Sequence, residues 1–302
     1  MMTEMNGRGG SSKPGRPWDC RKTLSLRVRR INASPEKHTA FGGPLNYEES
    51  NYPVRIYTLG VFMIERDGKP LVFRGKLQQK PLNMLKGIIA GGAKGVHDEQ
   101  LIDILWPEAE GDAAHNAFKM ALSRLRRLIG SNEAVRFHKG LVMLDSSRCW
   151  VDAWVFEQMA SGVENHRRGR QRPSLRSVEK MGKAFDLYKG KFLPADTAQV
   201  WTVYTRARLR RRFLRLVSAL AAYCEDSGNI EEAAECFERA LDIESMTEEF
   251  YQHLMACYQK LGRNAEAVAV YRRCREALDA GLGISPSTKT EALYLALISG
   301  RR

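Results

Sequence analysis

A pattern repeated at a distance of 34 residues is the strongest constraint on the fold of this chain. The segment Gly228-Asn-Ile-Glu-Glu-Ala233 recurs as Gly262-Arg-Asn-Ala-Glu-Ala267, and an aromatic residue follows each copy at the same offset, as Phe237 and Tyr271. In each copy the glycine permits a tight turn, the alanine lets two helices approach closely, and the ring fills the space between them. The pattern therefore predicts pairs of helices stacked as an array.

Further helices extend this array through the second half of the chain. The hydrophobic spacing predicts helices over residues 174–188, 197–226 and 286–299. A period of 34 residues is that of tetratricopeptide repeats, whose stacked helices present a groove to peptides or protein partners. We expect residues 151–302 to form a helical, tetratricopeptide-like domain whose role is recognition and not catalysis.

Residues 53–150 have a different organisation. Apolar runs over 54–64 and 71–73, joined by Asp67-Gly68, predict a small antiparallel sheet. Helical spacing then predicts three helices, the third over residues 112–129, and two strands at 134–137 and 141–144 form a hairpin. This order is typical of a winged helix-turn-helix domain. The fold class expected for the chain is mainly α with a small β part, an N-terminal winged helix followed by an α-helical array.

The third helix carries the residues that we expect to bind DNA. One face is apolar and must be core, while the opposite face carries cations and polar groups without a carboxylate, as a helix in a major groove requires. The candidate DNA-binding residues are Asn116, Lys119, Met120, Ser123, Arg126 and Arg127 on the helix, with Arg136, His138 and Lys139 on or near the hairpin turn. Among them Lys119, Arg126 and Arg127 are assigned to phosphates, and Asn116 and Ser123 to base edges. The alternatives are a solvated basic face and a surface turn.

Composition favours a nucleic-acid partner and excludes several classes of protein. The formal net charge is +13, and such basic proteins bind nucleic acid, anionic membranes or acidic partners. No apolar run approaches the ~20 residues of a membrane-spanning helix, and the N-terminus has no apolar signal core. Six cysteines without a C-x-x-C pair fit a reducing cytoplasm. Residues 1–52, rich in Gly, Ser, Pro and Arg, are expected to be a disordered basic tail.

No constellation of residues predicts catalysis, so we expect no enzyme, no cofactor and no metal site. His253 and Cys257 stand four residues apart, but two ligands do not make a metal site, and Cys257 is expected in the core. Cys20 and Cys149 are expected to be the more accessible thiols. The segment 206–215 contains six arginines, which are open to three interpretations: a solvated face, docking on the acidic repeats, or an auxiliary contact with DNA or a partner.

Several short segments together resemble a known family. Leu101-Ile-Asp-Ile-Leu-Trp-Pro-Glu108, His115-Asn116 and Leu122-Ser-Arg-Leu-Arg-Arg127 resemble the OmpR/PhoB-type winged helix of bacterial transcriptional activators. Leu187-Tyr-Lys-Gly-Lys-Phe-Leu-Pro194 and Leu282-Gly-Ile-Ser-Pro286 then follow as in the Streptomyces antibiotic regulatory protein type, in which a bacterial transcriptional activator domain of tetratricopeptide-like helices comes next. The hairpin turn departs from the Gly-Tyr wing tip that is common in that family.

The sequence and the resemblance lead to one functional hypothesis. We expect a cytoplasmic, sequence-specific DNA-binding regulator, an activator that inserts the third helix in the major groove of double-stranded DNA. By resemblance, the helical domain mediates self-association or partner contacts, RNA polymerase among them, and no membrane is involved. The alternative is a protein-interaction scaffold whose winged helix binds protein and not DNA.

Overall fold

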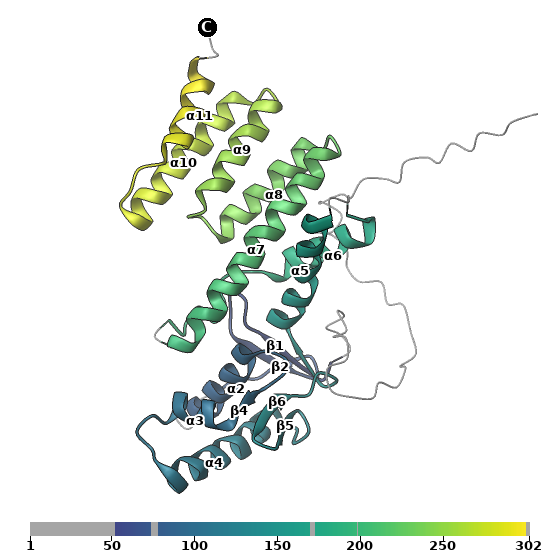
Figure 1. Cartoon of the computed structure of the whole chain (residues 1–302), viewed down its shortest axis with the longest axis vertical. Helices are drawn as coiled ribbons and strands as arrows, with labels where there is room; N and C mark the ends of the chain where they lie inside the picture. The colour runs from purple at the N-terminus through teal and green to yellow at the C-terminus, as the bar shows by residue number, and fades with distance from the viewer. Residues whose placement is uncertain (1–51, 74–77, 170–172, 198, 300–302) are drawn as a thin grey trace, which may run out of the picture.

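The computed structural model describes residues 52–73, 78–169, 173–197 and 199–299. A part made of three helices and short strands, here called the mixed part (residues 52–151), lies at one end of the molecule (Figure 1). A row of helices, here called the helical part (residues 152–299), extends from it to the opposite end, where the C-terminus lies. The chain is mainly helical with a small β part, as predicted. The expected basic tail lies outside the described residues apart from Tyr52.

Two small sheets make up the β structure, with strand orders β3-β2-β1-β7 and β4-β6-β5. The strands are β1 (Val54–Tyr57), β2 (Met63–Arg66), β3 (Lys69–Pro70), β4 (Val96–His97), β5 (Val135–His138), β6 (Leu141–Leu144) and β7 (Cys149–Val151). β1 and β2 are antiparallel, whereas β7 runs parallel to β1. Because a parallel pair needs a crossover connection, the chain passes through the three helices and the second sheet before it returns to β1.

The predicted strand over residues 71–73 is wrong, because the third strand of this sheet is Lys69–Pro70. Asp67 and Gly68 both have positive φ, 50° and 78°, which is the conformation of a two-residue hairpin turn. Because the turn has only two residues, the pairing between β2 and β3 begins directly after it, with Lys69 opposite Arg66. Val72 lies beyond the ladder and is exposed.

Three helices surround the core of the mixed part: α2 (Gln79–Gly91), α3 (Asp98–Leu105) and α4 (Gly111–Ile129). Apolar residues at helical spacing turn inward from each of them, among them Leu85, Leu101 and Leu125, all without exposed surface. The predicted third helix is confirmed to within one residue as α4. Gly130 ends it in the left-handed conformation, and its N–H donates to the carbonyl of Arg126 at 2.9 Å.

The helical part contains α5 (Asp152–Gly169), α6 (Leu175–Leu187), α7 (Val200–Asp226), α8 (Ile230–Ile243), α9 (Glu248–Lys260), α10 (Asn264–Leu282) and α11 (Thr288–Ser299). From α7 onward each helix packs on the next (Figure 1). The repeat prediction is confirmed at the positions that define it. Gly228 and Gly262 have φ of 79° and 72° in the turns, Ala233 and Ala267 are fully buried, and Phe237 lies in the core between helices.

A buried carboxylate joins the two parts. Asp152, the first residue of α5, accepts hydrogen bonds from the N–H of Thr58 at 2.7 Å, the N–H of Leu59 at 2.9 Å and the hydroxyl of Thr58 at 2.6 Å. The N–H of Ala153 donates to the same carboxylate at 2.7 Å. Burial raises the pKa of Asp152 to about 6, against the lowering effect of these four donors. The start of the helical part is thus fixed to the loop that follows β1.

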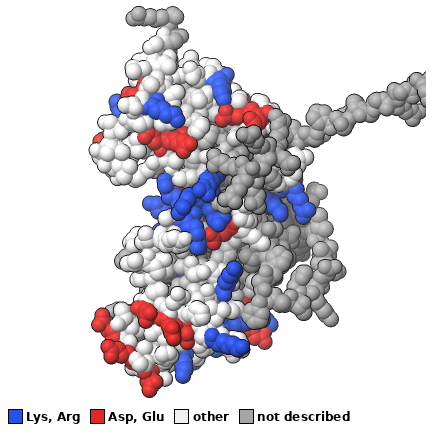
Figure 2. All heavy atoms as spheres, in the orientation of Figure 1, with Lys and Arg blue, Asp and Glu red and all other residues white. Residues whose placement is uncertain are grey.

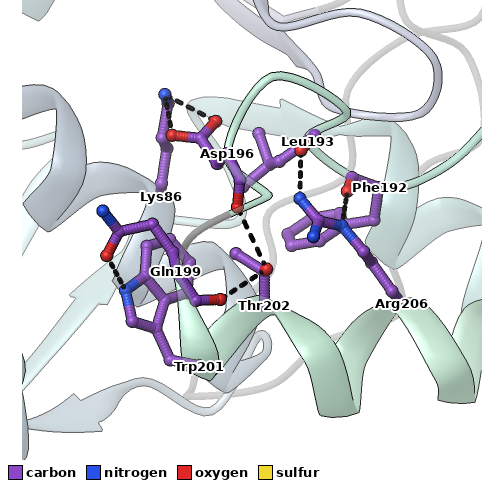
Figure 3. Close-up of polar contacts among 8 residues, drawn as sticks. All are labelled: Lys86, Phe192, Leu193, Asp196, Gln199, Trp201, Thr202 and Arg206. Carbon is purple, nitrogen blue, oxygen red and sulfur yellow. Dashed lines mark hydrogen bonds and ion pairs between the residues drawn. The ribbon is translucent and has the colours of Figure 1, made fainter.

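The helical part also holds the C-terminal end of α2. The indole N–H of Trp154 donates to the carbonyl of Ile89 at 2.9 Å, and the hydroxyl of Thr205 donates to the carbonyl of Ala90 at 3.1 Å. The bond from Thr205 satisfies a carbonyl in the last turn of α2, where the helix itself leaves carbonyls unpaired, whereas the carbonyl of Ile89 also accepts the N–H of Gly92 at 3.1 Å. Lys86, nearly buried, places its ammonium 2.8 Å from both oxygens of Asp196 in the segment that leads to α7 (Figure 3). The C-terminal end of α2 is therefore held by side chains from α5, from the segment before α7 and from α7 itself.

The segment before α7 is in turn fixed to that helix. Arg206 donates from Nε to the carbonyl of Phe192 at 2.7 Å and also binds the carbonyl of Leu193 (Figure 3). Thr202 donates to the carbonyl of Gln199 at 2.7 Å. The first two turns of α7 thereby hold the segment that carries Asp196, and with it the contact to Lys86.

Candidate nucleic-acid interface

The outer face of α4 is open. Residues on its inner side, such as Phe118 and Leu125, are buried, whereas Asn116, Lys119 and Ser123 are exposed. Met120 and Arg127 complete this face, and Met120 has 56% of its surface exposed. All of α4 lies within the described residues. Asp112 in the first turn shares this outer face, four residues before Asn116, and the face carries no carboxylate beyond it.

Arg126 differs from the other predicted contacts, because it is half-buried and bonded within the mixed part. Its Nε donates to the carbonyl of Val135 at 3.0 Å. Phe118 packs edge-on against Phe137, with ring centroids 5.3 Å apart. These two contacts fix the angle between α4 and β5, so Arg126 orients the helix relative to the hairpin.

Arg124 was not among the predicted contacts, although it is exposed beside the outer face. It stands four residues after Met120 and three before Arg127, and residues so spaced are neighbours on a helix surface. The same helical spacing that selected the other residues predicts its position. The exposed cations of α4 are therefore Lys119, Arg124 and Arg127.

The hairpin residues have different surroundings. His138 and Lys139 are exposed at the turn, where Lys139 and Gly140 have φ of 50° and 75°. Arg136 is exposed but forms an ion pair with the nearly buried Asp145, which offsets its charge. The hairpin turn is also anchored, since the carbonyl of Gly140 accepts from the N–H of Asp98 at 2.8 Å. Of the three predicted contacts, His138 and Lys139 keep their polar groups toward solvent.

Charge is distributed unevenly around α4. Asp112 lies in its first turn, where it complements the helix dipole, and Glu108 and Glu110 are exposed just before it. Acidic side chains gather at the end of the molecule that holds α3 and the start of α4 (Figure 2). The cations of α4 lie further along the helix, so its second half is the part suited to phosphates.

The arginine-rich segment 206–215 is largely occupied by contacts within the chain. Arg208 and Arg212 approach the same carboxylate, that of Glu157 in α5, at 2.9 and 3.5 Å. Arg210 pairs with the buried Glu244 at 2.7 Å, just after α8. Of the three interpretations, internal docking accounts for these arginines. Arg210 reaches the repeats, whereas Arg208 and Arg212 pair with α5. Basic side chains gather around the middle of the molecule, where α7 runs (Figure 2).

The thiol prediction for Cys149 is wrong. Cys149 has no exposed surface in β7, and burial raises the pKa of its thiol to about 12, which leaves it unreactive. Cys149 is buried because its strand, β7, pairs with β1 inside the mixed part. Cys257 is buried as expected, and Cys20 lies outside the described residues.

The fold and this surface define a class of protein: a small mixed part that presents a basic helix, fused to a helical repeat array of the recognition type. Among the described helices, none combines the length and the apolar character needed to cross a bilayer. Residues 151–298 match the family model of the bacterial transcriptional activator domain. The matched segment thus comprises the helical part and Val151, the last residue of β7.

Curated relatives extend the likeness over most of the chain. The chain is 28% identical over 260 residues to Regulatory protein AfsR of Streptomyces coelicolor (strain ATCC BAA-471 / A3(2) / M145). This alignment covers 85% of this chain and 25% of that protein. It is 26% identical over 231 residues to Regulatory protein AfsR of Streptomyces griseus, covering 76% of this chain and 23% of that protein. The chain thus spans about a quarter of the length of the curated relatives that it matches.

The likeness in fold extends to a solved structure. The structure of Mycobacterium tuberculosis EmbR in complex with a low affinity phosphopeptide matches with a TM-score of 0.57 and 20% identity, over 83% of this chain and 66% of that chain. The matched domain and the AfsR relatives support a bacterial transcriptional regulator of the Streptomyces antibiotic regulatory protein kind. They point to regulation of transcription.

Proposed function

We propose that this protein is a sequence-specific DNA-binding activator of transcription that acts in the cytoplasm and inserts α4 in the major groove of double-stranded DNA. Residues 53–150 form an OmpR/PhoB-type winged helix-turn-helix domain, with the β5–β6 hairpin as its wing. Residues 151–302 form the tetratricopeptide-like activator domain.

One observation carries this proposal: beyond the first turn, which holds Asp112, the exposed face of α4 offers hydrogen-bond donors and cations and no carboxylate. Lys119, Arg124 and Arg127 suit phosphate oxygens, which supply most of the affinity of a protein for DNA. Asn116 and Ser123 suit base edges, which supply sequence discrimination. Lys139 and His138 at the wing turn suit the adjacent backbone or minor groove. Arg126 and Arg136 support the domain through their internal contacts.

The helical part serves association in this proposal. Repeat arrays recognise peptides and proteins, and we propose self-association and RNA polymerase as its partners. The junction at Asp152 and the grip on α2 support a role in which the helical part sets the orientation of the DNA-binding helix.

Arg127→Ala tests the DNA contact. Genomic fragments selected on the protein at about 150 mM salt supply the site, and the dissociation constant is measured over a range of salt concentrations. Each phosphate contact contributes about −0.9 to the slope of log K against log salt, so the variant should bind more weakly with a slope shallower by about 0.9. Lys119→Ala should behave in the same way.

Arg272→Ala is the matched control, since it removes one exposed positive charge from α10, at a distance from α4. This control should keep the affinity and slope of the natural protein. If both arginine variants change the slope equally, or neither does, α4 is not the DNA-binding face. Weak, salt-labile retention of all fragments alike would favour the alternative, a scaffold whose winged helix binds protein.

A further inference from the structure

An exposed apolar stripe runs along the first turns of α7. Val200, Val203 and Tyr204 have 84%, 56% and 70% of their surfaces exposed, and Ala207 and Arg211 continue the same face as exposed residues. The spacing of three, four and seven residues from Val200 places the first four side chains in one row. Large apolar side chains exposed together in this way mark sites of association, whereas single ones do not. We call these five residues the α7 stripe.

The α7 stripe is flanked by positive charge that is only partly compensated by carboxylates. No acidic residue occurs in α7 before Glu225. Arg208 borders the stripe with its guanidinium carbon 5.7 Å from the Tyr204 ring centroid, and it shares the single carboxylate of Glu157 with Arg212. Arg211 makes no ion pair with any residue that the structure describes. The partner that complements this surface is therefore apolar along one line and acidic beside it.

The chemistry of the stripe disfavours two other occupants. A duplex needs donors for phosphates and gains nothing from Val200 and Val203. A second copy paired through the same stripe would bring the arginines of both copies together, and like charges across an interface cost affinity. Tyrosine and arginine are the side chains that contribute most at protein interfaces.

The inner side of the same helical turns holds the mixed part. Thr205 donates to Ala90 of α2 at 3.1 Å, and Arg206 holds the segment whose Asp196 pairs with Lys86. A partner bound to the outer side of these turns could shift the start of α7 and, with it, the contacts that orient α2. The stripe thus lies on the same helical turns that contact the mixed part, so binding of a partner there can affect the mixed part directly.

We propose that the α7 stripe is a docking surface for an acidic amphipathic helix of a partner protein. Such a helix lays leucine-like side chains at intervals of three and four residues along the stripe, as in other helix-docking surfaces. Its carboxylates face Arg208 and Arg211. This inference goes beyond DNA binding and does not depend on it.

The test uses the full chain and a synthetic probe. The probe is a fluorescein-labelled peptide of about sixteen residues, four helical turns, with leucines at helical spacing flanked by glutamates. A second peptide has lysines in place of the glutamates. Fluorescence anisotropy should show binding of the acidic peptide and at least tenfold weaker binding of the basic one. Tyr204→Ala should weaken the acidic complex about tenfold or more, and Arg211→Glu should weaken it most at low salt.

Leu175→Ala is the matched control, because Leu175 is exposed to a similar degree, 53%, on α6. This variant should bind the acidic peptide as the natural protein does. Equal binding of both peptides, or no effect of Tyr204→Ala, overturns the proposal. Light scattering that shows a dimer of the unliganded chain, lost in Tyr204→Ala, overturns it in favour of self-pairing. Unchanged DNA binding by both stripe variants keeps this outcome separate from that of the proposed function.

Discussion

Single buried polar groups hold the two parts of this molecule together, and Asp152 is the one with the most donors. Two N–H groups and a hydroxyl from the loop after β1, and the N–H of Ala153, all point at its carboxylate. A buried carboxylate loses its hydration, and here burial outweighs the four donors, so the pKa is raised and the carboxyl ionises less readily in the folded protein than in the unfolded chain.

This balance gives the stability of the protein a dependence on pH with a defined sign. The pKa of Asp152 rises from 3.8 in the unfolded chain to about 6 in the folded one, so folding takes up a proton between these values. The stability contributed by this proton is fully present below about pH 4 and is lost as the pH rises through 6. Urea unfolding from pH 4 to 7.5 should show this loss in the natural protein and not in Asp152→Asn. A contribution that grows with pH would contradict the assignment.

At the scale of the elements, a comparison of two glycines distinguishes the cost of backbone strain from the cost of a steric clash. Gly95 leads into β4 with φ of 91°, and a Cβ there would lie 2.7 Å from the backbone oxygen of Val142 in β6. Gly92 has a similar φ of 97°, but a Cβ would meet nothing within 4 Å. A non-glycine residue in this region costs about 1–3 kcal/mol from backbone strain alone.

Gly95→Ala should therefore destabilise the fold more than Gly92→Ala does. We expect about 1–2 kcal/mol for Gly92→Ala, and a larger loss for Gly95→Ala, since β4 must move away from β6. Urea unfolding measures both values. The β5–β6 hairpin should also shift, so on the proposed function Gly95→Ala should weaken DNA binding while Gly92→Ala leaves it unchanged. Equal losses of stability in the two variants would mean that β4 yields without resistance.

The elements that the sequence reveals are those with a local signal. The row of apolar residues in α4 and the glycine after it predict that helix to within one residue. The β2–β3 hairpin is predicted by its two-residue turn, Asp67-Gly68. Strand β7 has no such signal, because all three residues are buried and its partner β1 lies about a hundred residues earlier. The first turns of α5, buried on every side from Ala153 to Phe156, likewise lack a period.

The same distinction applies to the candidate site. Helical spacing predicts which residues of α4 face outward, and Asn116, Lys119 and Arg127 do so. Spacing does not reveal that Arg126 reaches the carbonyl of Val135 or that Asp145 neutralises Arg136, because both partners come from other elements.

At the scale of the whole molecule, the contacts on α2 decide whether the two parts act as one body. Lys86 and Asp196 are both nearly buried, with side-chain exposures of 10% and 12%, and the Lys86 ammonium also lies 4.5 Å from the ring centroid of Phe62. Removal of one member of a buried pair leaves the other charge without compensation and costs about 3–5 kcal/mol. Replacement of both Lys86 and Asp196 by uncharged residues costs less stability than the sum of the two single replacements, because no buried charge is then left without a partner.

A double-mutant cycle on this pair measures the coupling between the parts. Lys86→Met and Asp196→Asn should each destabilise the protein strongly, and the double variant should be more stable than the sum of the two losses by about 1–3 kcal/mol. Calorimetry should show one unfolding transition for the natural chain, because the grip on α2 transmits unfolding of either part to the other. In Lys86→Met combined with Thr205→Val, which also removes the bond to Ala90, the mixed part should melt first in a separate transition. Retention of a single transition there would show that the contacts of Asp152 and Trp154 suffice to couple the mixed part to the array.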